Sequence, residues 1–306
     1  MSKGEIALVE WLRARFPADP ARVPIGIGDD AAAVRLDSPL VAITTDMLLD
    51  GVHFDTERHG YELIGRKVMA CSLSDCAAMA CNPRAATVSV ALPRTMAIED
   101  VRELYEGIAR IAEEYECSLV GGDTTSWAGR LAIDVAMLAE PMAPCGPVRR
   151  STAVLGDTIF VSGPLGGSLA GRHLTFTPRI ALARALAVDP ALHAMMDISD
   201  GLSLDLFRLC RASGCAAELY ADQLAKAISD DARAQAEQDG RSPLDHALSD
   251  GEDFELLVVG GQDLRKFKLL PVGAIRPCKP GADLMVISQP DGRREPLAPR
   301  GYEHLT

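Results

Sequence analysis

The sequence predicts a mixed α/β chain of two domains. Strand-like and helical patterns alternate along the first half, and both kinds of pattern begin again near residue 157. Such mixtures are typical of α/β or α+β domains. A length of 306 residues also suits two domains of ordinary size. Residues 140–147, EPMAPCGP, carry three prolines and no periodicity, so we place a linker there, between domains at residues 1–140 and 148–306.

Hydrophobic periodicity predicts the individual elements. The chain is expected to open with an amphipathic helix, because Ile6, Val9, Leu12 and Phe16 are spaced for one helical face. Apolar runs predict the strands of the first domain, and longer helical patterns lie between them. These strands are Ala31–Leu36, Leu40–Thr44, Arg84–Leu92, Ser118–Val120 and Leu131–Ala139, and the helices run from about Tyr61 to Cys81 and over Ile98–Tyr115.

The second domain shows the same kinds of pattern. A glycine turn precedes its first strand, and proline lies near the first turn of one helix, where its missing N–H costs nothing. The expected strands are Asp157–Ser162, Ala217–Tyr220, Phe254–Val259 and Val272–Ile275, and the expected helices are Pro178–Val188 and Leu202–Ala212.

Composition excludes several kinds of partner. The formal net charge of −12 argues against nucleic acid and anionic membranes, which favour basic surfaces. No window reaches the roughly 18 unbroken apolar residues of a membrane span, and the amphipathic start is unlike a signal peptide. Eight cysteines without a CxxC pair fit a reduced compartment. We therefore expect a soluble, cytoplasmic protein.

The most informative feature is a set of aspartates in short motifs rich in glycine, serine and threonine. Several lie beside apolar stretches, where gathered carboxylates repel one another unless cations separate them. Oxygen ligands without a His or Cys cluster favour a hard ion such as Mg²⁺, which commonly bridges carboxylates and nucleotide phosphates. The sequence thus predicts an enzyme that uses Mg²⁺ and ATP. The set comprises Asp29, Asp30, Asp46, Asp75, Asp123, Asp197 and Asp200.

The motifs differ in how specific they are. GIGDD (Gly26 to Asp30) could cradle a phosphate, but a Gly-Asp turn is also a common way to enter a strand. In TTDMLLDGVHF, Thr44, Thr45 and Asp46 combine hydroxyls with a carboxylate at an expected strand end, a familiar pairing in phosphate sites. His53 in the following loop could contact a phosphate or be inert.

The remaining aspartates each have a structural alternative. Asp75 lies on an apolar helical face, so either an arginine such as Arg66 pairs with it or a metal does. GGDTT (Gly121 to Thr125) follows an apolar run, which places it at an expected carboxyl end, where α/β sheets bind ligands. In DISDGLS, Asp200 could simply cap a helix, an interaction worth about 1 kcal/mol.

Other signals concern the phosphates and a second substrate. The chain has no GxxxxGK[ST] loop and no kinase HRD or DFG motif, so metals and arginines such as Arg149 and Arg150 would balance phosphate charge. Two adjacent arginines are otherwise ordinary surface residues. In SDGEDFELL, Glu252 and Asp253 could bind a cationic substrate or form a polar turn, and Tyr302 supplies an aromatic ring near the end.

In this order the motifs GIGDDAAAV, TTDMLLDGVHF, SDCAAM, GGDTT, DISDGL, GEDFEL and GYEH resemble thiamine-monophosphate kinase over residues 26–304. The resemblance implies the two-domain fold of aminoimidazole ribonucleotide synthetase. In that fold the N-terminal domain builds a β-barrel across a homodimer interface, and an α/β domain follows. It also implies transfer of the ATP γ-phosphate onto the phosphate of thiamine monophosphate, giving thiamine diphosphate.

The resemblance further implies three groups of site residues. Glu252 would face the cationic substrate, and Tyr302 could stack on one of its rings. The metal group is Asp30, Thr44, Thr45, Asp46, Asp75, Asp123, Asp197 and Asp200, the ATP group is Tyr105, Gly121, Gly122, Arg150 and Ser199, and the thiamine-phosphate group is His53, Glu252 and Tyr302.

Relatives on the same fold fit less well. The first 70 residues contain no cysteine, unlike a selenide water dikinase, and the chain ends GYEHLT rather than in an acceptor cysteine like the hydrogenase-maturation protein. The stretch from GPLGGSLAG to RHLTFTPRI is shorter than usual, with Gly167 where the family often has Asp. A nucleotide- or Mg²⁺-binding regulatory protein remains the alternative, which retained donor and acceptor residues argue against.

Overall fold

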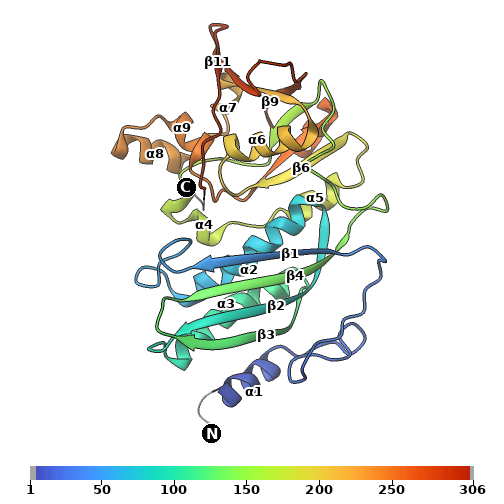
Figure 1. The fold of residues 1–306 in the computed structure, drawn as a ribbon, viewed down its shortest axis with the longest axis vertical. Helices are drawn as coiled ribbons and strands as arrows, with labels where there is room; N and C mark the ends of the chain where they lie inside the picture. The colour runs from blue at the N-terminus through green and yellow to red at the C-terminus, as the bar shows by residue number, and fades with distance from the viewer. Residues whose placement is uncertain (1–4, 304–306) are drawn as a thin grey trace. The chain divides into compact units, whose positions relative to one another are not determined.

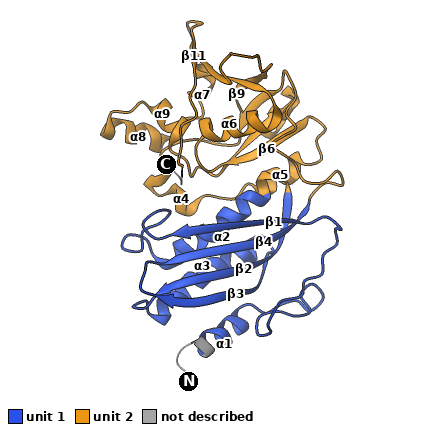
Figure 2. Cartoon of the chain, in the orientation of Figure 1, with its two compact units in different colours: residues 1–76, 81–141 blue, residues 77–80, 142–306 orange. Residues whose placement is uncertain are grey.

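A computed structural model describes residues 5–303 of the chain, which divide into two compact units (Figures 1 and 2). Unit 1 comprises residues 1–76 and 81–141, and unit 2 comprises residues 77–80 and 142–306. The end of the GYEH motif, His304, lies outside the described residues. Among the described helices, none is long and apolar enough to cross a membrane.

Unit 1 is built around a mixed sheet with α2 and α3 against one face (Figure 1). Over residues 5–303 its strand order is β1-β4-β2-β3, and only the β2–β3 pair is parallel. The sheet is open in this part of the chain, with β1 and β3 at its edges. The elements are α1 (Glu5–Arg15), β1 (Ala42–Leu49), α2 (Tyr61–Ala78), β2 (Cys81–Pro93), α3 (Ile98–Glu114), β3 (Ser118–Trp127) and β4 (Ala132–Pro141).

Close helix packing fixes the geometry of this unit. Gly65 of α2 lies against α3, so that a Cβ there would stand 1.9 Å from the carbonyl oxygen of Leu104. Gly107 of α3 approaches Glu62 in the same way, with 2.0 Å between a built Cβ and the carbonyl oxygen. The two glycines let the helix backbones touch. Behind them, Ile64, Leu104 and Ile108 are fully buried and form the core beneath the sheet.

In unit 1, one predicted strand is wrong and two others have different bounds from those predicted. Ala31–Leu36 is not a strand but a loop tied to the chain just before it, because the Ala33 N–H donates to Ile25 O and the Arg35 N–H to Arg22 O. The strand expected at Leu40–Thr44 runs over Ala42–Leu49, and the one expected at Ser118–Val120 extends to Trp127.

Pairing explains both extensions. Every residue of β1 has a partner on β4, from Ala42 opposite Ala139 to Leu49 opposite Ala132, so the sheet satisfies the backbone of a polar stretch. Thr44–Asp46 and Gly121–Asp123 therefore lie inside strands rather than at strand ends. The expected linker also begins later, because Glu140 belongs to β4 and is buried in an ion pair with Arg84.

Unit 2 contains a second sheet with the strand order β11-β10-β7-β9-β5-β8-β6 within the described chain. The β10–β7 pair is parallel and the other pairs are antiparallel. Sequence reasoning predicted four of these strands, β5, β7, β8 and β9, and two helices, α5 (Ile180–Leu186) and α6 (Leu202–Ser213). The strands are β5 (Thr158–Val161), β6 (Leu192–Ile198), β7 (Ala216–Tyr220), β8 (Glu255–Gly260), β9 (Leu270–Arg276), β10 (Met285–Ser288) and β11 (Arg294–Pro296).

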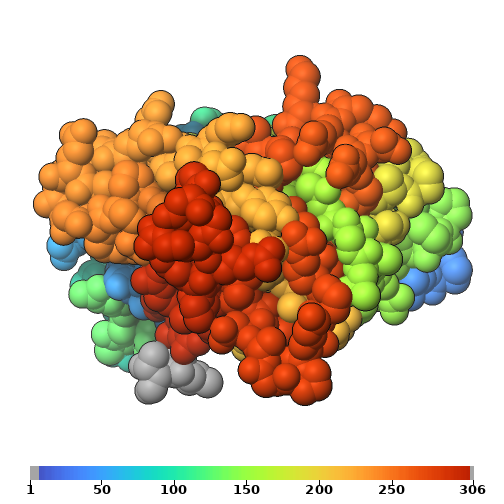
Figure 3. All heavy atoms as spheres, turned by 90° about the horizontal axis from the view of Figure 1, so that it is seen from above, coloured from blue at the N-terminus to red at the C-terminus, as the bar shows by residue number. Residues whose placement is uncertain are grey.

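The helices of unit 2 are mostly short. Leu202, Leu206 and Leu209 of α6 are fully buried and join the aliphatic core of the sheet. The last described residues of the chain, coloured red, lie on the surface of this unit (Figure 3). The helices are α4 (Arg172–Thr175), α5 (Ile180–Leu186), α6 (Leu202–Ser213), α7 (Ala221–Leu224), α8 (Asp230–Asp239) and α9 (Pro243–Ser249), with 3₁₀ turns η1 (Ser168–Ala170) and η2 (Gln262–Phe267).

Candidate active site

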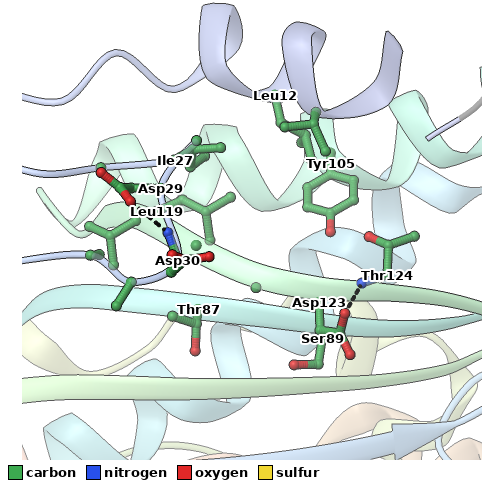
Figure 4. Close-up of a pocket in the computed structure, with 18 residues that line it drawn as sticks. Leu12, Ile27, Asp29, Asp30, Thr87, Ser89, Tyr105, Leu119, Asp123 and Thr124 are labelled. Atoms are coloured by element: carbon green, nitrogen blue, oxygen red, sulfur yellow. Dashed lines mark hydrogen bonds between the residues drawn. The ribbon is translucent and has the colours of Figure 1, made fainter. Parts of the chain in front are cut away.

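Unit 1 contains a pocket of about 840 Å³ (Figure 4). Five predicted site residues meet in its lining, from the GIGDD loop, α3 and β3. Hydroxyl groups of Thr87, Ser89 and Thr124 and apolar side chains of Leu12, Ile27 and Leu119 complete it, so the pocket offers both apolar and acidic surface. The five are Asp30, Tyr105, Gly121, Gly122 and Asp123, and Asp29 lies beside them.

Tyr105 forms a buried wall of this pocket. Its ring is 2% exposed, lies edge-on to Phe16 with ring centres 6.4 Å apart, and points its hydroxyl toward Thr124 (Figure 4). Burial raises the pKa of Tyr105 to about 12, so the hydroxyl stays a neutral donor. Such a group can orient a ligand without adding charge.

Gly122 allows the backbone of the pocket to form. It has φ +154°, and a Cβ at this position would stand 1.9 Å from the Val88 carbonyl oxygen. Only glycine therefore fits against β2 here. Gly121 is less constrained, since its built Cβ would make an ordinary contact of 3.6 Å with Thr87.

A second group of predicted residues lies between β1 and α2. The Thr44 hydroxyl donates to Asp75, and the Ser72 hydroxyl donates to Asp46 at 2.6 Å. Burial, and then the negative charges of Asp75 and Asp134, raise the pKa of Asp46 to about 7. The carboxylates therefore repel one another when ionised, and a cation between them would relieve that repulsion. Burial lowers the pKa of Arg66, and the negative charge of Glu114 partly offsets that shift.

Asp134 and Ser89 lie beside predicted site residues, and sequence reasoning missed both of them. The Thr45 hydroxyl donates to Asp134 at 2.8 Å. On the sheet, Asp134 lies opposite Ser89 of β2, and Ser89 lies opposite Asp123 of β3, so the three form one row across neighbouring strands. The available signal was a single aspartate inside the apolar run Leu131–Ala139.

The oxygen ligands fit a loosely held hard ion. Among residues 5–303, no three His, Cys, Asp or Glu side chains are grouped so that they alone could hold a metal. Mg²⁺ does not need such a cage, since it usually keeps waters and takes one or two carboxylates plus substrate phosphates. The Asp46–Asp75 pair and the nearby hydroxyls of Thr44 and Ser72 match that donor chemistry.

His53 lies in the loop that follows β1. Its Nδ1 accepts a hydrogen bond from the Leu49 N–H at 3.0 Å, so a neutral ring carries its proton on Nε2. The buried ammonium of Lys67 donates to the His53 carbonyl oxygen, which fixes the loop backbone. The ring position is thus set by the fold of unit 1.

In unit 2, backbone hydrogen bonds bring three predicted motifs together. The Glu252 N–H donates to Ser199 O at 2.6 Å, and the Tyr302 N–H donates to Asp200 O at 3.0 Å. Asp197 is buried near the end of β6, two residues before Ser199. DISDG, GEDF and the start of GYEH therefore form one surface, on which Tyr302 is 46% exposed.

The structure does not show the capping of α6 by Asp200 that was the alternative to a metal role for this residue. The residue before the helix is Gly201, and no side chain caps it. Instead the buried carboxylate of Asp205 accepts the N–H groups of Ser199, Asp200 and Gly201 at 3.0–3.2 Å. Arg208 donates to Asp205 at 2.8 Å and also to Asp200. Asp200 is thus held by an arginine.

Arg150 lies elsewhere in unit 2. Its carbonyl oxygen accepts from Ser213 Oγ at 2.8 Å, at the end of α6, whereas Asp200 and Ser199 precede the start of that helix. The 12 residues of α6 separate the two places by roughly 18 Å at 1.5 Å per residue. The structure therefore does not bring Arg150 to the surface formed by Ser199, Glu252 and Tyr302.

Comparisons with known proteins identify the fold and the family. Residues 28–140 match the AIR synthase related protein, N-terminal domain, and residues 156–268 match the C-terminal domain. The chain is therefore an AIR synthase related protein with the two-domain fold that the sequence predicted. It is 44% identical to thiamine-monophosphate kinase of Rhodopirellula baltica, with 83% of this chain and 81% of that protein covered.

Two further matches span almost the whole chain. Thiamine-monophosphate kinase of Aquifex aeolicus is 32% identical, with 99% of this chain and 98% of the relative covered. The structure of AaThiL complexed with AMPPCP and TMP is 28% identical, has a TM-score of 0.78, and covers 100% of this chain and 99% of its own. The chain belongs to the thiamine-monophosphate kinase family, and the predicted kinase class is confirmed.

Proposed function

We propose that the protein transfers the γ-phosphate of ATP directly onto the phosphate of thiamine monophosphate, giving thiamine diphosphate and ADP. The observation that carries this is its 44% identity to a thiamine-monophosphate kinase, together with structural similarity to a complex that holds AMPPCP and TMP. The acceptor phosphate is already an anionic nucleophile and needs no general base. Positioning and charge neutralisation are then the main tasks of the site.

The nucleotide half of this proposal rests on unit 1. We assign the pocket lined by Tyr105, Gly121 and Gly122 to ATP, because it combines apolar walls with a close-approaching glycine backbone. Several Mg²⁺ ions, when bound, would neutralise the transferring phosphates. Their proposed ligands in this unit are Asp30, Thr44, Thr45, Asp46, Asp75 and Asp123, and Asp134 joins them through its contact with Thr45.

The other assignments follow the resemblance. In unit 2, Glu252 and Tyr302 would contact the thiamine moiety, Ser199 and Arg150 would contact ATP, and Asp197 and Asp200 would bind Mg²⁺. What supports Glu252 is its place on one surface with Ser199 and Tyr302. In unit 1, His53 would contact the acceptor through the Nε2 side of its ring, because Nδ1 already accepts from Leu49.

Substrate discrimination tests the acceptor. At saturating Mg²⁺ and ATP, steady-state rates with thiamine monophosphate should far exceed those with thiamine, because an alcohol acceptor would leave metal charge uncompensated and lacks a base here. Glu252→Gln should raise the KM for the acceptor and leave the KM for ATP near wild type. Equal or faster use of free thiamine would overturn the acceptor assignment. An unchanged acceptor KM in the variant would remove Glu252 from the site.

We also propose a homodimer formed through unit 1. On the edge strand β1, Ile43 is 74% exposed and Met47 is 62% exposed. Both side chains lie on the face of the sheet opposite to the buried Leu48. Large apolar side chains exposed in this way commonly mark a surface that packs against a partner. Light scattering at micromolar concentration should give the mass of a dimer. A monomeric mass would contradict the proposal, and Ile43→Lys should shift the dimer toward monomer.

A further inference from the structure

The shortened glycine-rich stretch noted in the sequence lies against the motif that carries Glu252. We name residues 163–179 the clamp segment and residues 250–255 the acceptor loop. Both belong to unit 2. The clamp segment contains the η1 turn and α4, and two of its glycines approach other backbone closely. A Cβ on Gly166 would stand 2.6 Å from Ala247 N, and one on Gly167 would stand 2.4 Å from Ala232 N.

The clamp segment bonds to the acceptor loop before Glu252. The Gly167 N–H donates to Asp250 Oδ2 at 2.9 Å, and Ser168 Oγ donates to the Gly251 carbonyl oxygen at 2.7 Å. These two bonds fix the backbone as it enters Glu252.

The same segment holds the loop after Glu252. The Phe176 ring stacks on Phe254 at 4.1 Å between centres and 16° between planes, and Arg179 Nε donates to Glu255 at 2.8 Å. Glu252 itself is bonded through its N–H to Ser199, and its side chain is half-buried between buried neighbours. The clamp segment thus contacts the acceptor loop on both sides of Glu252.

Asp253 is the central contact of this arrangement. Its side chain is 1% exposed, accepts the Gly166 N–H at 2.9 Å, and pairs with Arg172 Nη2 at 3.0 Å. Arg172 also donates to the carbonyl oxygens of Gly166 and Pro164, so the arginine ties the clamp segment to itself and to Asp253. Burial raises the pKa of Asp253 to about 7, which the Arg172 charge and the Gly166 bond oppose.

The loop needs such support because its backbone is strained. Glu252 has φ +51° and Phe254 has φ +50°, both in the left-handed region that non-glycine residues rarely adopt. Strain of this kind persists only where the surroundings over-determine the conformation, and it gathers at functional sites. Asp253 lies between the two strained residues, and its side chain is held by the ion pair with Arg172.

We infer that Asp253 and Arg172 are positioning residues that hold Glu252 in the conformation that binds the acceptor. This inference rests on the proposed role of Glu252 in acceptor binding. Neither residue needs to touch a substrate. Loss of their contact would release the strained backbone and move the Glu252 carboxylate, so acceptor binding should weaken while nucleotide binding in unit 1 is kept.

The test uses the full-length protein with Mg²⁺, ATP and thiamine monophosphate. Asp253→Asn and Arg172→Gln each remove one partner of the ion pair. Each should raise the acceptor KM by roughly tenfold and leave the ATP KM within about twofold of the wild-type value. The combined variant should cost little more than either single variant, because both remove one interaction. If one variant fails to fold by circular dichroism, the other still decides.

Glu218→Gln is the matched control. Glu218 is also a buried carboxylate of unit 2, with ion pairs to Arg276 and Arg294 at 2.8 Å, but it joins β7, β9, β10 and β11. Glu218→Gln should lower the melting temperature and leave the acceptor KM unchanged. A similar KM increase in this control would overturn the positioning role, since general destabilisation would then explain the effect.

The outcomes separate this inference from the proposed function. If Glu252→Gln raises the acceptor KM and both clamp variants do not, the positioning role is wrong and the acceptor site stands. If Glu252→Gln has no effect, the acceptor assignment fails and the inference fails with it. An acceptor KM raised by Glu252→Gln and by both clamp variants, but not by the control, supports both.

Discussion

Replacing Asp46 by asparagine should stabilise the metal-free protein at alkaline pH. The carboxyl group lies beside Asp75 and Asp134, and its pKa is raised from 3.8 to about 7. Once ionised in the folded protein, the group therefore costs roughly 4 kcal/mol relative to the unfolded chain. Asparagine has the same shape, carries no charge, and can still accept the hydrogen bond from Ser72.

The sign of the pH dependence follows from the raised pKa. The folded protein holds a proton on Asp46 that the unfolded chain has lost, so this contribution to stability is complete below pH 4 and disappears as the pH rises through 7. Asp46→Asn should thus gain roughly 2–4 kcal/mol over wild type at pH 8 and less than about 1 kcal/mol at pH 4. At about 3 °C per kcal/mol for a unit of this size, the gain at pH 8 is on the order of 6–12 °C.

Differential scanning calorimetry in EDTA at the two pH values measures this directly. Asp123→Asn is the control, because Asp123 is exposed on β3 and its replacement should change stability by less than about 0.5 kcal/mol. The reasoning would be refuted if Asp46→Asn melted at or below wild type at pH 8. It would also be refuted if the gain were the same at both pH values.

Two further predictions concern unit 1. Asp75→Asn should abolish turnover while the melting temperature of the metal-free protein holds or rises, because one charge of a repelling pair is removed; normal turnover at low Mg²⁺ would contradict the metal assignment. Gly65→Ala should destabilise the protein by about 1–3 kcal/mol in urea titration, since the new methyl group would collide with the Leu104 carbonyl oxygen and force α2 away from α3. An unchanged midpoint would show that the two helices separate without cost.

The sequence predicted α2, α3 and α6 well because their signal is local. Helical periodicity places Asp75 on a face with Ser72, and the structure keeps both beside β1. Strand lengths were harder to predict. TTD and GGDTT read as strand ends because polar and glycine residues interrupt the apolar runs, whereas pairing with β4 and β2 continues the strands through them.

Candidate site residues that lie in a local sequence motif could be predicted, whereas those brought together only by strand pairing could not. GIGDD, GGD and Tyr105, to which the resemblance assigns metal and ATP contacts, line one pocket. Asp134 and Ser89 join Asp123 only because β4, β2 and β3 are neighbours in a particular register, which no local pattern contains. In unit 2, the sequence offered helix capping by Asp200 as an alternative to its metal role, whereas the carboxylate that binds the turn before α6 comes from Asp205 inside the helix.

The central claim is transfer of a phosphoryl group from ATP onto the phosphate of thiamine monophosphate. It is tested most directly by incubating the protein with Mg²⁺ and ATP, with and without thiamine monophosphate, and quantifying ADP and thiamine diphosphate together. We expect one thiamine diphosphate for each ADP, and almost no ADP without the acceptor. ADP released at the same rate in both reactions, with no thiamine diphosphate formed, would contradict the claim.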